Sequence, residues 1–186
     1  MKIFMPEHSK AAYLADFILY GVAIVCLAIF LILAGPQDQA LEMLFLVVLG
    51  LMAWTAIEYF LHRVILHEVQ PFKRWHEEHH LRPTALIRTP TILSASLIAS
   101  LIFFPILLFG GSLWRACSLT LGLLMGYLMY TITHHAIHHW RVDNAWLKKR
   151  QQWHGSHHDS NDIGRFGITS RVWDRVCGTA GPVPKK

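Results

Sequence analysis

The chain has 186 residues, of which 53% are hydrophobic and 16% are charged. It is more apolar and less charged than an average soluble domain, which excludes a disordered chain and argues against an ordinary soluble domain. The three cysteines (Cys26, Cys117 and Cys177) lie far apart without a C-x-x-C pair, so the sequence also argues against a disulfide scaffold. A chain of this length predicts one domain, over residues 1–186.

Four apolar runs predict the architecture. A helix needs about 20 apolar residues to cross the hydrocarbon core of a bilayer, and runs close to this length occur at residues 17–34, 43–59, 92–109 and 116–133. Each run is apolar on all sides and lacks the polar face that a helix of a soluble bundle shows to water. Pro105 lies inside the third run and is expected to kink it. The predicted fold class is therefore an all-α integral membrane protein with four transmembrane helices.

The basic residues predict how these helices are oriented. Lys and Arg collect in the short cytoplasmic loops of membrane proteins. If the N-terminus faces the cytoplasm, 16 of the 17 basic residues lie on the cytoplasmic side and only Arg115 lies on the other. Both termini are thus expected in the cytoplasm. The formal net charge of +5 then reflects membrane orientation and contact with anionic lipid, and nucleic acid is not an expected partner.

Thirteen histidines are the most unusual feature of the composition, and twelve of them fall into four groups that follow the second and fourth apolar runs. FLHRVILH holds His62 and His67, RWHEEHH holds His76, His79 and His80, THHAIHH holds His134, His135, His138 and His139, and QWHGSHH holds His154, His157 and His158. An even number of spans precedes each group, so all four reach the same face of the membrane. We therefore expect a cytoplasmic, helical, histidine-rich cap formed by residues 62–80 and 134–158.

The spacing of the histidines places several of them on shared helix faces. His76, His79 and His80 follow an i, i+3, i+4 pattern on a helix expected between two prolines. QWHGSHH repeats this pattern on a helix for which Asp143 is the predicted N-cap. His134 and His138 are also one turn apart.

Two spacings leave alternatives open. His62 and His67 cannot face one point on a straight α-helix, because five residues rotate the chain by about 140° beyond a full turn. Either the helix ends between them or they bind two different metal ions. In the third group, His135 and His139 form a second pair that points about 100° away from His134 and His138.

The number of imidazoles predicts a metal site. Neutral imidazole suits Zn, Cu, Fe and Ni. One ion rarely takes more than six ligands, so ten or more gathered histidines imply two metal ions. The alternative is a solvated surface that happens to be rich in histidine.

The boxes H-x4-H, H-x-x-H-H, H-x3-H and H-x-x-H-H, interleaved with paired spans, resemble the fatty acid hydroxylase/sterol desaturase superfamily of membrane di-metal oxygenases. The motifs that carry the resemblance are EYFLHRVILH (58–67), GYLMYTITHHAIHH (126–139) and HGSHH followed by FGITSRVWDRVCGT (154–179). The resemblance covers residues 54–179 and is strongest for the fatty acid 2-hydroxylase branch. It implies ten metal ligands: His62, His67, His76, His79, His80, His134, His138, His154, His157 and His158. In the third box, the pattern of the related carotenoid hydroxylases would select His139 in place of His138.

The resemblance also implies an activity. We expect an oxidoreductase that hydroxylates or desaturates a C–H bond of a membrane lipid, above all of a fatty acyl chain, with O2 as co-substrate. Two iron ions are the expected cofactors, with zinc as a substitute in purified samples. A carotenoid or sterol-type substrate of the same superfamily is the alternative.

The sequence departs from the fatty acid 2-hydroxylase pattern in two respects. Only eight residues separate His67 from His76, which is nearer the spacing of the carotenoid hydroxylases. The sequence also has no His-Pro-Gly-Gly motif of a fused haem-binding domain. We therefore expect electrons from a separate protein, a ferredoxin or a cytochrome with its reductase. The compact chain leads us to expect a bacterial inner membrane.

Glu58 is a candidate to orient one of the metal-binding histidines. It lies one turn before His62, near the end of a span, where a carboxylate is usually partnered. Metal-bound histidines typically donate their second ring N–H to a carboxylate or carbonyl. The hypothesis is a hydrogen bond between Glu58 and His62, and the alternative is an ion pair with Arg63 or with another arginine.

Alternatives of a different class are a histidine-rich membrane metal transporter or metal-binding protein, and a membrane cytochrome. A transporter or a cytochrome would place histidines or acidic residues near the middle of the spans. The four apolar runs have none there.

Overall fold

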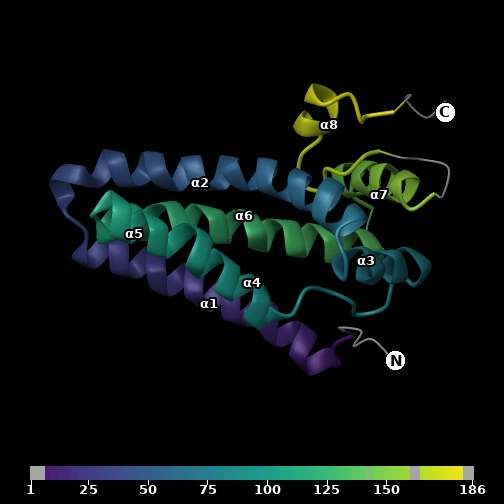
Figure 1. Ribbon diagram of the computed structural model, residues 1–186, viewed down its shortest axis with the longest axis horizontal. Helices are drawn as coiled ribbons and strands as arrows, with labels where there is room; N and C mark the ends of the chain where they lie inside the picture. The colour runs from purple at the N-terminus through teal and green to yellow at the C-terminus, as the bar shows by residue number, and fades with distance from the viewer. Residues whose placement is uncertain (1–6, 142, 160–163, 182–186) are drawn as a thin grey trace. The chain divides into compact units, whose positions relative to one another are not determined.

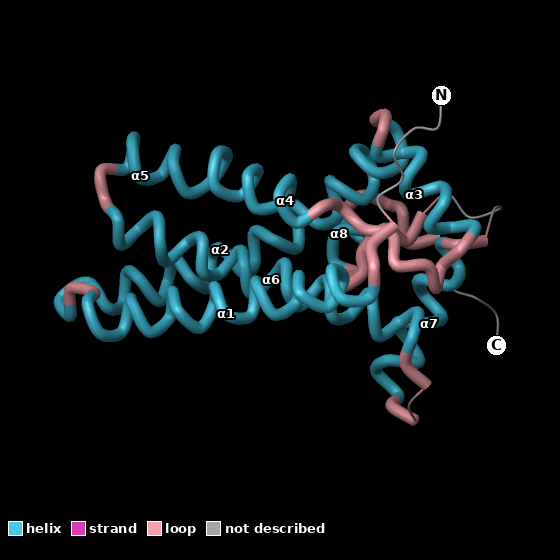
Figure 2. The backbone as a smooth tube through the Cα atoms, turned by 90° about the horizontal axis from the view of Figure 1, so that it is seen from below, coloured by secondary structure: helices cyan, strands magenta, loops and turns pink. Residues whose placement is uncertain are grey.

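The computed structural model describes residues 7–141, 143–159 and 164–181. In these ranges every regular element is a helix, and Figure 2 shows the described chain as helix and loop alone. The predicted all-α class is confirmed. Lys2, Lys185 and Lys186, which the orientation argument counts among the basic residues, lie outside the described residues.

Four helices within the described ranges are long and apolar enough to cross a membrane. They are Lys10–Ala34 (α1), Gln37–Leu66 (a short turn at Gln37–Gln39, α2 at Ala40–Phe60 and the π-helical turn η2 at Leu61–Leu66), Thr91–Gly110 (α4 at Thr91–Ile98, the π-helical turn η3 at Ala99–Phe103 and α5 at Phe104–Gly110) and Leu113–His139 (α6). Large apolar side chains remain exposed on them, including Leu33 (79%) and Phe109 (90%). Such surfaces mark contact with lipid when they are extensive. The chain is an integral membrane protein.

The third span contains a widened, π-helical turn just before its proline. Pro105 stands near the start of α5, directly after η3. Its ring would clash with the carbonyl one turn earlier in a regular α-helix, and it cannot donate a hydrogen bond. The i→i+5 pattern of a π-turn removes this conflict at a single turn.

The chain forms two compact units, and the metal-binding candidates fall in the second. The first unit comprises Met1–Trp54 and Leu86–Leu128, and the second comprises Thr55–Ala85 and Met129–Lys186. The chain passes from one unit to the other within α2, after Ala85 and within α6.

In the first unit α1, α4, α5 and the first parts of α2 and α6 lie side by side (Figure 1). Leu31, Cys117 and Leu121 form its buried apolar cluster. The helices α2 and α6 approach closely at two glycines. A Cβ on Gly122 would lie 2.0 Å from the carbonyl oxygen of Val47, and one on Gly50 would lie 2.3 Å from that of Leu119. Small residues at such crossings let the two backbones approach.

The first unit also buries an ion pair. The helix α1 begins at Lys10, earlier than the predicted run, so Asp16 lies inside it and is only 3% exposed. Its Oδ2 lies 2.6 Å from Nη2 of Arg88, whose guanidinium also covers the rings of Tyr13 and Phe17. The polar partner explains how an acidic residue is tolerated within a helix of this apolar class.

The second unit contains α3 (Phe72–Leu81), α7 (Ala145–His157) and α8 (Val172–Val176), together with the end of α2, η2 and the end of α6. Ala136, Ile137, Leu147 and Ile168 form its apolar core. The N-cap of α7 is Asn144, whose side chain accepts from the backbone N–H of Leu147 at 3.0 Å, so the prediction of Asp143 was wrong by one residue.

Candidate metal centre

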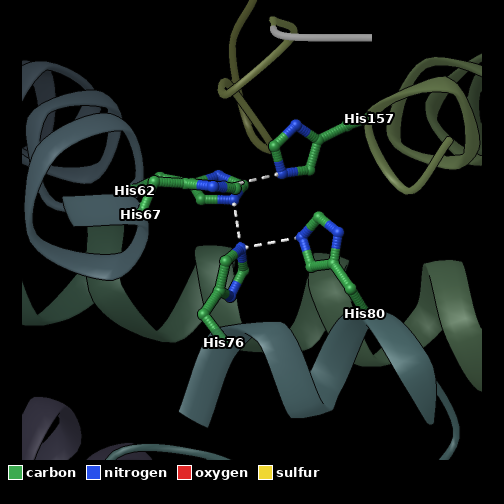
Figure 3. A group of neighbouring side chains, drawn as sticks. All are labelled: His62, His67, His76, His80 and His157. Carbon is green, nitrogen blue, oxygen red and sulfur yellow. Dashed lines mark hydrogen bonds between the residues drawn. The ribbon is translucent and has the colours of Figure 1, made fainter. Parts of the chain in front are cut away.

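Five histidines form a first cluster in the second unit: His62, His67, His76, His80 and His157. One ring nitrogen from each lies within 4.8 Å of the corresponding nitrogen of every other member. Figure 3 shows the rings of His76 and His80, both on α3, pointing toward those of His62 and His67. The Nε2 atoms of His62 and His76 lie 2.9 Å apart, and those of His67 and His157 lie 3.2 Å apart.

The π-helical turn η2 explains how His62 and His67 can share this cluster. His62 lies within η2 and His67 follows its last residue. A π-turn closes i→i+5 hydrogen bonds, so residues five apart come to lie one above the other. Neither alternative from the sequence applies, because the helix widens between the two histidines and both face the same point. A straight α-helical reading of H-x4-H could not reveal this.

Four further histidines form a second cluster: His79, His134, His138 and His154. The Nε2 atoms of His134, His138 and His154 form a closed triangle with sides of 3.0 to 3.2 Å. A neutral ring nitrogen either carries a hydrogen and donates or carries a lone pair and accepts. In a closed triangle at least one pair must therefore be donor against donor or acceptor against acceptor.

A bound cation resolves this conflict, because all three lone pairs can then point at it. Neighbouring imidazole nitrogens that share an ion at about 2.1 Å are separated by roughly 3 Å, which matches the triangle. The buried Nε2 of His79, in the same cluster, has no hydrogen-bond partner in the described part of the chain. The arrangement thus fits a metal ion better than a network of hydrogen bonds.

Each H-x-x-H-H box contributes to both clusters. On α3, His76 and His80 belong to the first cluster and His79 to the second. On α7, His157 belongs to the first cluster and His154 to the second. Shared helix faces, as expected from the i, i+3, i+4 spacing, therefore do not mean a shared ion.

The structure brings nine of the ten candidate ligands into the two clusters and leaves His158 outside both. His158 nevertheless contacts each of them, with its Nε2 3.0 Å from that of His154 and its ring stacked on His80 at 4.2 Å. In the third box, His138 lies in the second cluster, whereas His135 and His139 stack on each other at 4.4 Å outside it.

A loop over residues 164–170, here called the carbonyl loop, supplies acceptors to the first cluster. Nδ1 of His62 donates to the carbonyl oxygen of Phe166 at 2.6 Å, and Nδ1 of His157 donates to that of Gly164 at 2.7 Å. These bonds place the hydrogen on Nδ1 and leave the lone pair on Nε2, which is the tautomer that binds a metal through Nε2. Arg165, between the two carbonyls, has a positive φ of 61°.

The sequence did not identify these acceptors, because backbone carbonyls leave no mark in residue types. The only available signal was the motif FGITSRVWD, which carried the family resemblance without an assigned role. The ring of Phe166 also packs against His62, His67 and His157, at centroid distances between 5.4 and 5.7 Å.

Glu58 holds the carbonyl loop, and the hypothesis of a hydrogen bond to His62 was wrong. Its buried carboxylate accepts from the backbone N–H groups of Ile168 (2.7 Å) and Thr169 (2.9 Å) and from the Thr169 hydroxyl. The ion pair with Arg63 does not form either, since Arg63 donates to the hydroxyl of Tyr59. Nδ1 of His62 is already bound to the backbone carbonyl of Phe166, and Glu58 instead binds the backbone of the carbonyl loop.

Burial keeps the cluster histidines that lie outside the candidate spans uncharged. Desolvation and the neighbouring imidazoles lower the pKa of His79 to about 2. Desolvation likewise lowers the pKa of His157 to about 3 and that of His80 to about 4. Because metals bind the unprotonated ring, these groups are ready to act as ligands at neutral pH. An all-imidazole donor set suits iron, zinc or copper.

Comparison with known proteins agrees with the family resemblance of the histidine boxes. The family model described as fatty acid hydroxylase matches residues 47–179. The chain is 32% identical over 146 residues to the ceramide very long chain fatty acid hydroxylase scs7 of Schizosaccharomyces pombe, covering 73% of this chain and 42% of that protein. It is 32% identical over 142 residues to the dihydroceramide fatty acyl 2-hydroxylase FAH2 of Arabidopsis thaliana, covering 72% of this chain and 60% of that protein.

A solved structure is also similar. The structure titled full length scs7p, in which only the hydroxylase domain is visible, matches with a TM-score of 0.75 and 27% sequence identity. The match covers 94% of this chain and 70% of that chain. The chain thus spans between about two fifths and three fifths of the length of the two relatives named above. The matched residues contain both histidine clusters, and the chain belongs to the fatty acid hydroxylase family.

Proposed function

We propose that this chain is an O2-dependent hydroxylase of a lipid-borne fatty acyl chain, with one metal ion in each histidine cluster. The observation that carries the proposal is the convergence of nine imidazoles on two points. Four helices of the described chain are long and apolar enough to span a membrane, so the candidate substrate is a lipid. The ten histidines implied by the family resemblance are the proposed ligands, with His158 joining the second cluster through its contact with His154.

The relatives favour hydroxylation over desaturation and indicate the class of substrate. Two of them are named for the hydroxylation of fatty acids in ceramide or dihydroceramide, one specifically at position 2 of the acyl chain. We extend this to the present chain as hydroxylation next to the acyl carbonyl of an N-acylated lipid. A carotenoid or sterol substrate has no support from these names.

The proposed reaction converts a C–H bond, O2, two electrons and two protons into C–OH and water. Bound iron would supply the reduction of O2 and the oxidation of the C–H bond. Zinc has no redox chemistry, so zinc in the clusters would give an inactive protein. The imidazoles hold the ions, the carbonyl loop fixes His62 and His157, and the low pKa of the buried rings keeps protons from competing for the lone pairs.

The electron donor and the orientation are further parts of the proposal. We propose that a separate ferredoxin, or a cytochrome with its reductase, supplies the electrons at the cytoplasmic face where both termini lie. The distribution of basic residues supports this orientation, and exposed Lys148, Lys149 and Arg175 in the second unit would attract an acidic donor. The bacterial inner membrane stays a prediction from the sequence.

The test is the formation of a hydroxylated acyl chain from labelled oxygen. Purified protein in lipid nanodiscs is loaded with iron and supplied with a reductase, a ferredoxin, an N-acylated lipid and ¹⁸O2, and the acyl chains are analysed by mass spectrometry. One ¹⁸O atom per product acyl chain is expected from the wild type and none from His79→Ala. Iron-loaded wild type that takes up no label with any acyl lipid, although it consumes the reductant, would overturn the proposal.

A further inference from the structure

We propose that Asp174 is a positioning residue for the first metal cluster alone, so that the two ions are held with unequal dependence on the carbonyl loop. Within the described residues, the hydrogen-bond partners of the Asp174 carboxylate are Phe166, Gly167 and Thr179, and none is a histidine. The inference rests on the proposed function in one respect, namely that both clusters bind metal.

Asp174 and His62 hold the same peptide unit from opposite sides. In a planar trans peptide the C=O and the following N–H point in opposite directions. The carbonyl of Phe166 accepts from Nδ1 of His62, and the N–H of the same peptide unit, on Gly167, donates to Oδ2 of Asp174 at 2.9 Å. The direction of the carbonyl that fixes His62 is therefore set by the carboxylate behind it.

The peptide unit that fixes His157 is held in the same manner. The carbonyl of Gly164 accepts from Nδ1 of His157, and the N–H of Arg165 donates to the carbonyl oxygen of Thr179 at 2.9 Å. Thr179 is itself bound to Asp174, through its N–H to the backbone oxygen (2.8 Å) and through its hydroxyl to Oδ1 (2.9 Å). Both acceptors of the first cluster thus depend on Asp174.

The carboxylate of Asp174 is buried and turned toward the backbone of the carbonyl loop, which suits it to hold that loop. Asp174 is fully buried, with 0% exposure, and it also accepts from the N–H of Phe166 at 2.9 Å. Together with Glu58 it accepts from four successive backbone N–H groups, those of residues 166–169. A buried carboxylate that is an acceptor only is costly unless donors surround it, so these bonds fix the loop rigidly.

The second cluster has no such support in the described ranges. The buried Nδ1 of His154 has no hydrogen-bond partner there, and His79, His134 and His138 form no bond to a backbone carbonyl. Partners behind a metal-bound histidine set its orientation and basicity, and their loss typically costs about 10–100-fold in metal affinity. Disturbing Asp174 should therefore weaken one ion and spare the other.

The test compares metal binding by full-length wild type, Asp174→Asn and the matched control Asp143→Asn. Asn keeps one acceptor oxygen but turns an NH2 group toward a backbone N–H of the loop. Asp143 lies in the same unit, is exposed and pairs with Lys148, so its change to Asn is chemically identical but remote from the loop. Metal per chain is measured after reconstitution with Co²⁺, and affinity is measured by competition with a chelator.

We expect about two ions per chain in the wild type and in Asp143→Asn, one for each cluster. In Asp174→Asn one ion should bind roughly 10–100-fold more weakly while the other is unchanged. His79→Ala should lose the other ion, and the Co²⁺ absorption bands retained by the two variants should differ. Equal weakening of both ions, or unchanged binding of both, would refute the assignment of Asp174.

A second variant and the metal content of the wild type cover the remaining outcomes. If Asp174→Asn does not fold, Thr179→Val removes the hydroxyl bonds to Asp174 and to Tyr59 but keeps the backbone bonds of Thr179, and it should weaken the same single ion by a few-fold. Unchanged binding in Thr179→Val would then count against the inference. Fewer than two ions in the wild type would instead contradict the proposed function, and the two failures are thereby distinguished.

Discussion

His62 and Phe166 are joined across 104 positions of sequence, because Nδ1 of His62 donates to the carbonyl oxygen of Phe166 at 2.6 Å. The bond connects the first histidine box with the C-terminal FGITSRVWD motif. It leaves Nε2 of His62 as an acceptor, 2.9 Å from Nε2 of His76. The geometry of the first cluster therefore depends on a segment that contributes no metal ligand of its own.

The two clusters should lose their ions independently. His79 belongs to the second cluster and His157 to the first, and each substitution to Ala removes one ring from one site. Wild type purified in detergent should carry about two metal ions per chain, and each variant about one. Metal analysis by mass spectrometry checks this. Unchanged metal content in both variants would mean that the clusters are not ligand sets.

The third box gives a sharper comparison between neighbouring histidines. His138 lies in the second cluster, whereas His139 stacks on His135 outside it. His138→Ala should therefore lose about one ion per chain, while His139→Ala should keep both. The same metal analysis decides between them. Loss of metal in His139→Ala with retention in His138→Ala would instead select the H-x4-H pattern of the carotenoid hydroxylases.

The histidine boxes, the apolar runs and the helical class could be predicted because they reside in residue types and their periodicity. The joint placement of His62 and His67 could not, since it requires a π-turn that no propensity marks. The division of each H-x-x-H-H box between two clusters depends on how α3 and α7 pack in the second unit, which spacing alone does not contain. Glu58 was assigned to the wrong partner because a backbone carbonyl 104 positions from His62 takes the expected place.

Stability of the metal-free protein should fall with acid. Burial lowers the pKa of His67, His80 and His158 to about 4, from an ordinary value of 6.5. Between pH 6.5 and 4 the unfolded chain thus binds more protons than the folded one, and stability decreases as the pH falls through this window. Thermal melting of the metal-free protein at pH 7, 5.5 and 4.5 checks the sign. A melting temperature that stays constant or rises toward pH 4.5 would contradict it.

The buried ion pair of the first unit should matter more than an exposed one. Asp16→Ala leaves Arg88 without its carboxylate in a buried position, and breaking such a pair typically costs about 3–5 kcal/mol. Glu42→Ala breaks the pair with Arg115, whose side chains are both more than two fifths exposed, and should cost about 0–1 kcal/mol. Thermal melting in detergent compares the two variants. A cost for Asp16→Ala no larger than that for Glu42→Ala would show that Arg88 finds another partner.

The close crossing of α2 and α6 should reject even one added methyl group. In Gly122→Ala the new Cβ would lie 2.0 Å from the carbonyl oxygen of Val47, which is backbone and cannot move aside as a flexible side chain can. Overpacking of this kind typically costs about 1–3 kcal/mol. Gly21 is a matched control within α1, because a Cβ there meets nothing within 4 Å, and Gly21→Ala should stabilise the helix by roughly 0.5–1 kcal/mol. Melting temperatures that shift in opposite directions in the two variants are expected. A neutral Gly122→Ala would mean that the two helices can separate without loss, and that the glycines do not determine their packing.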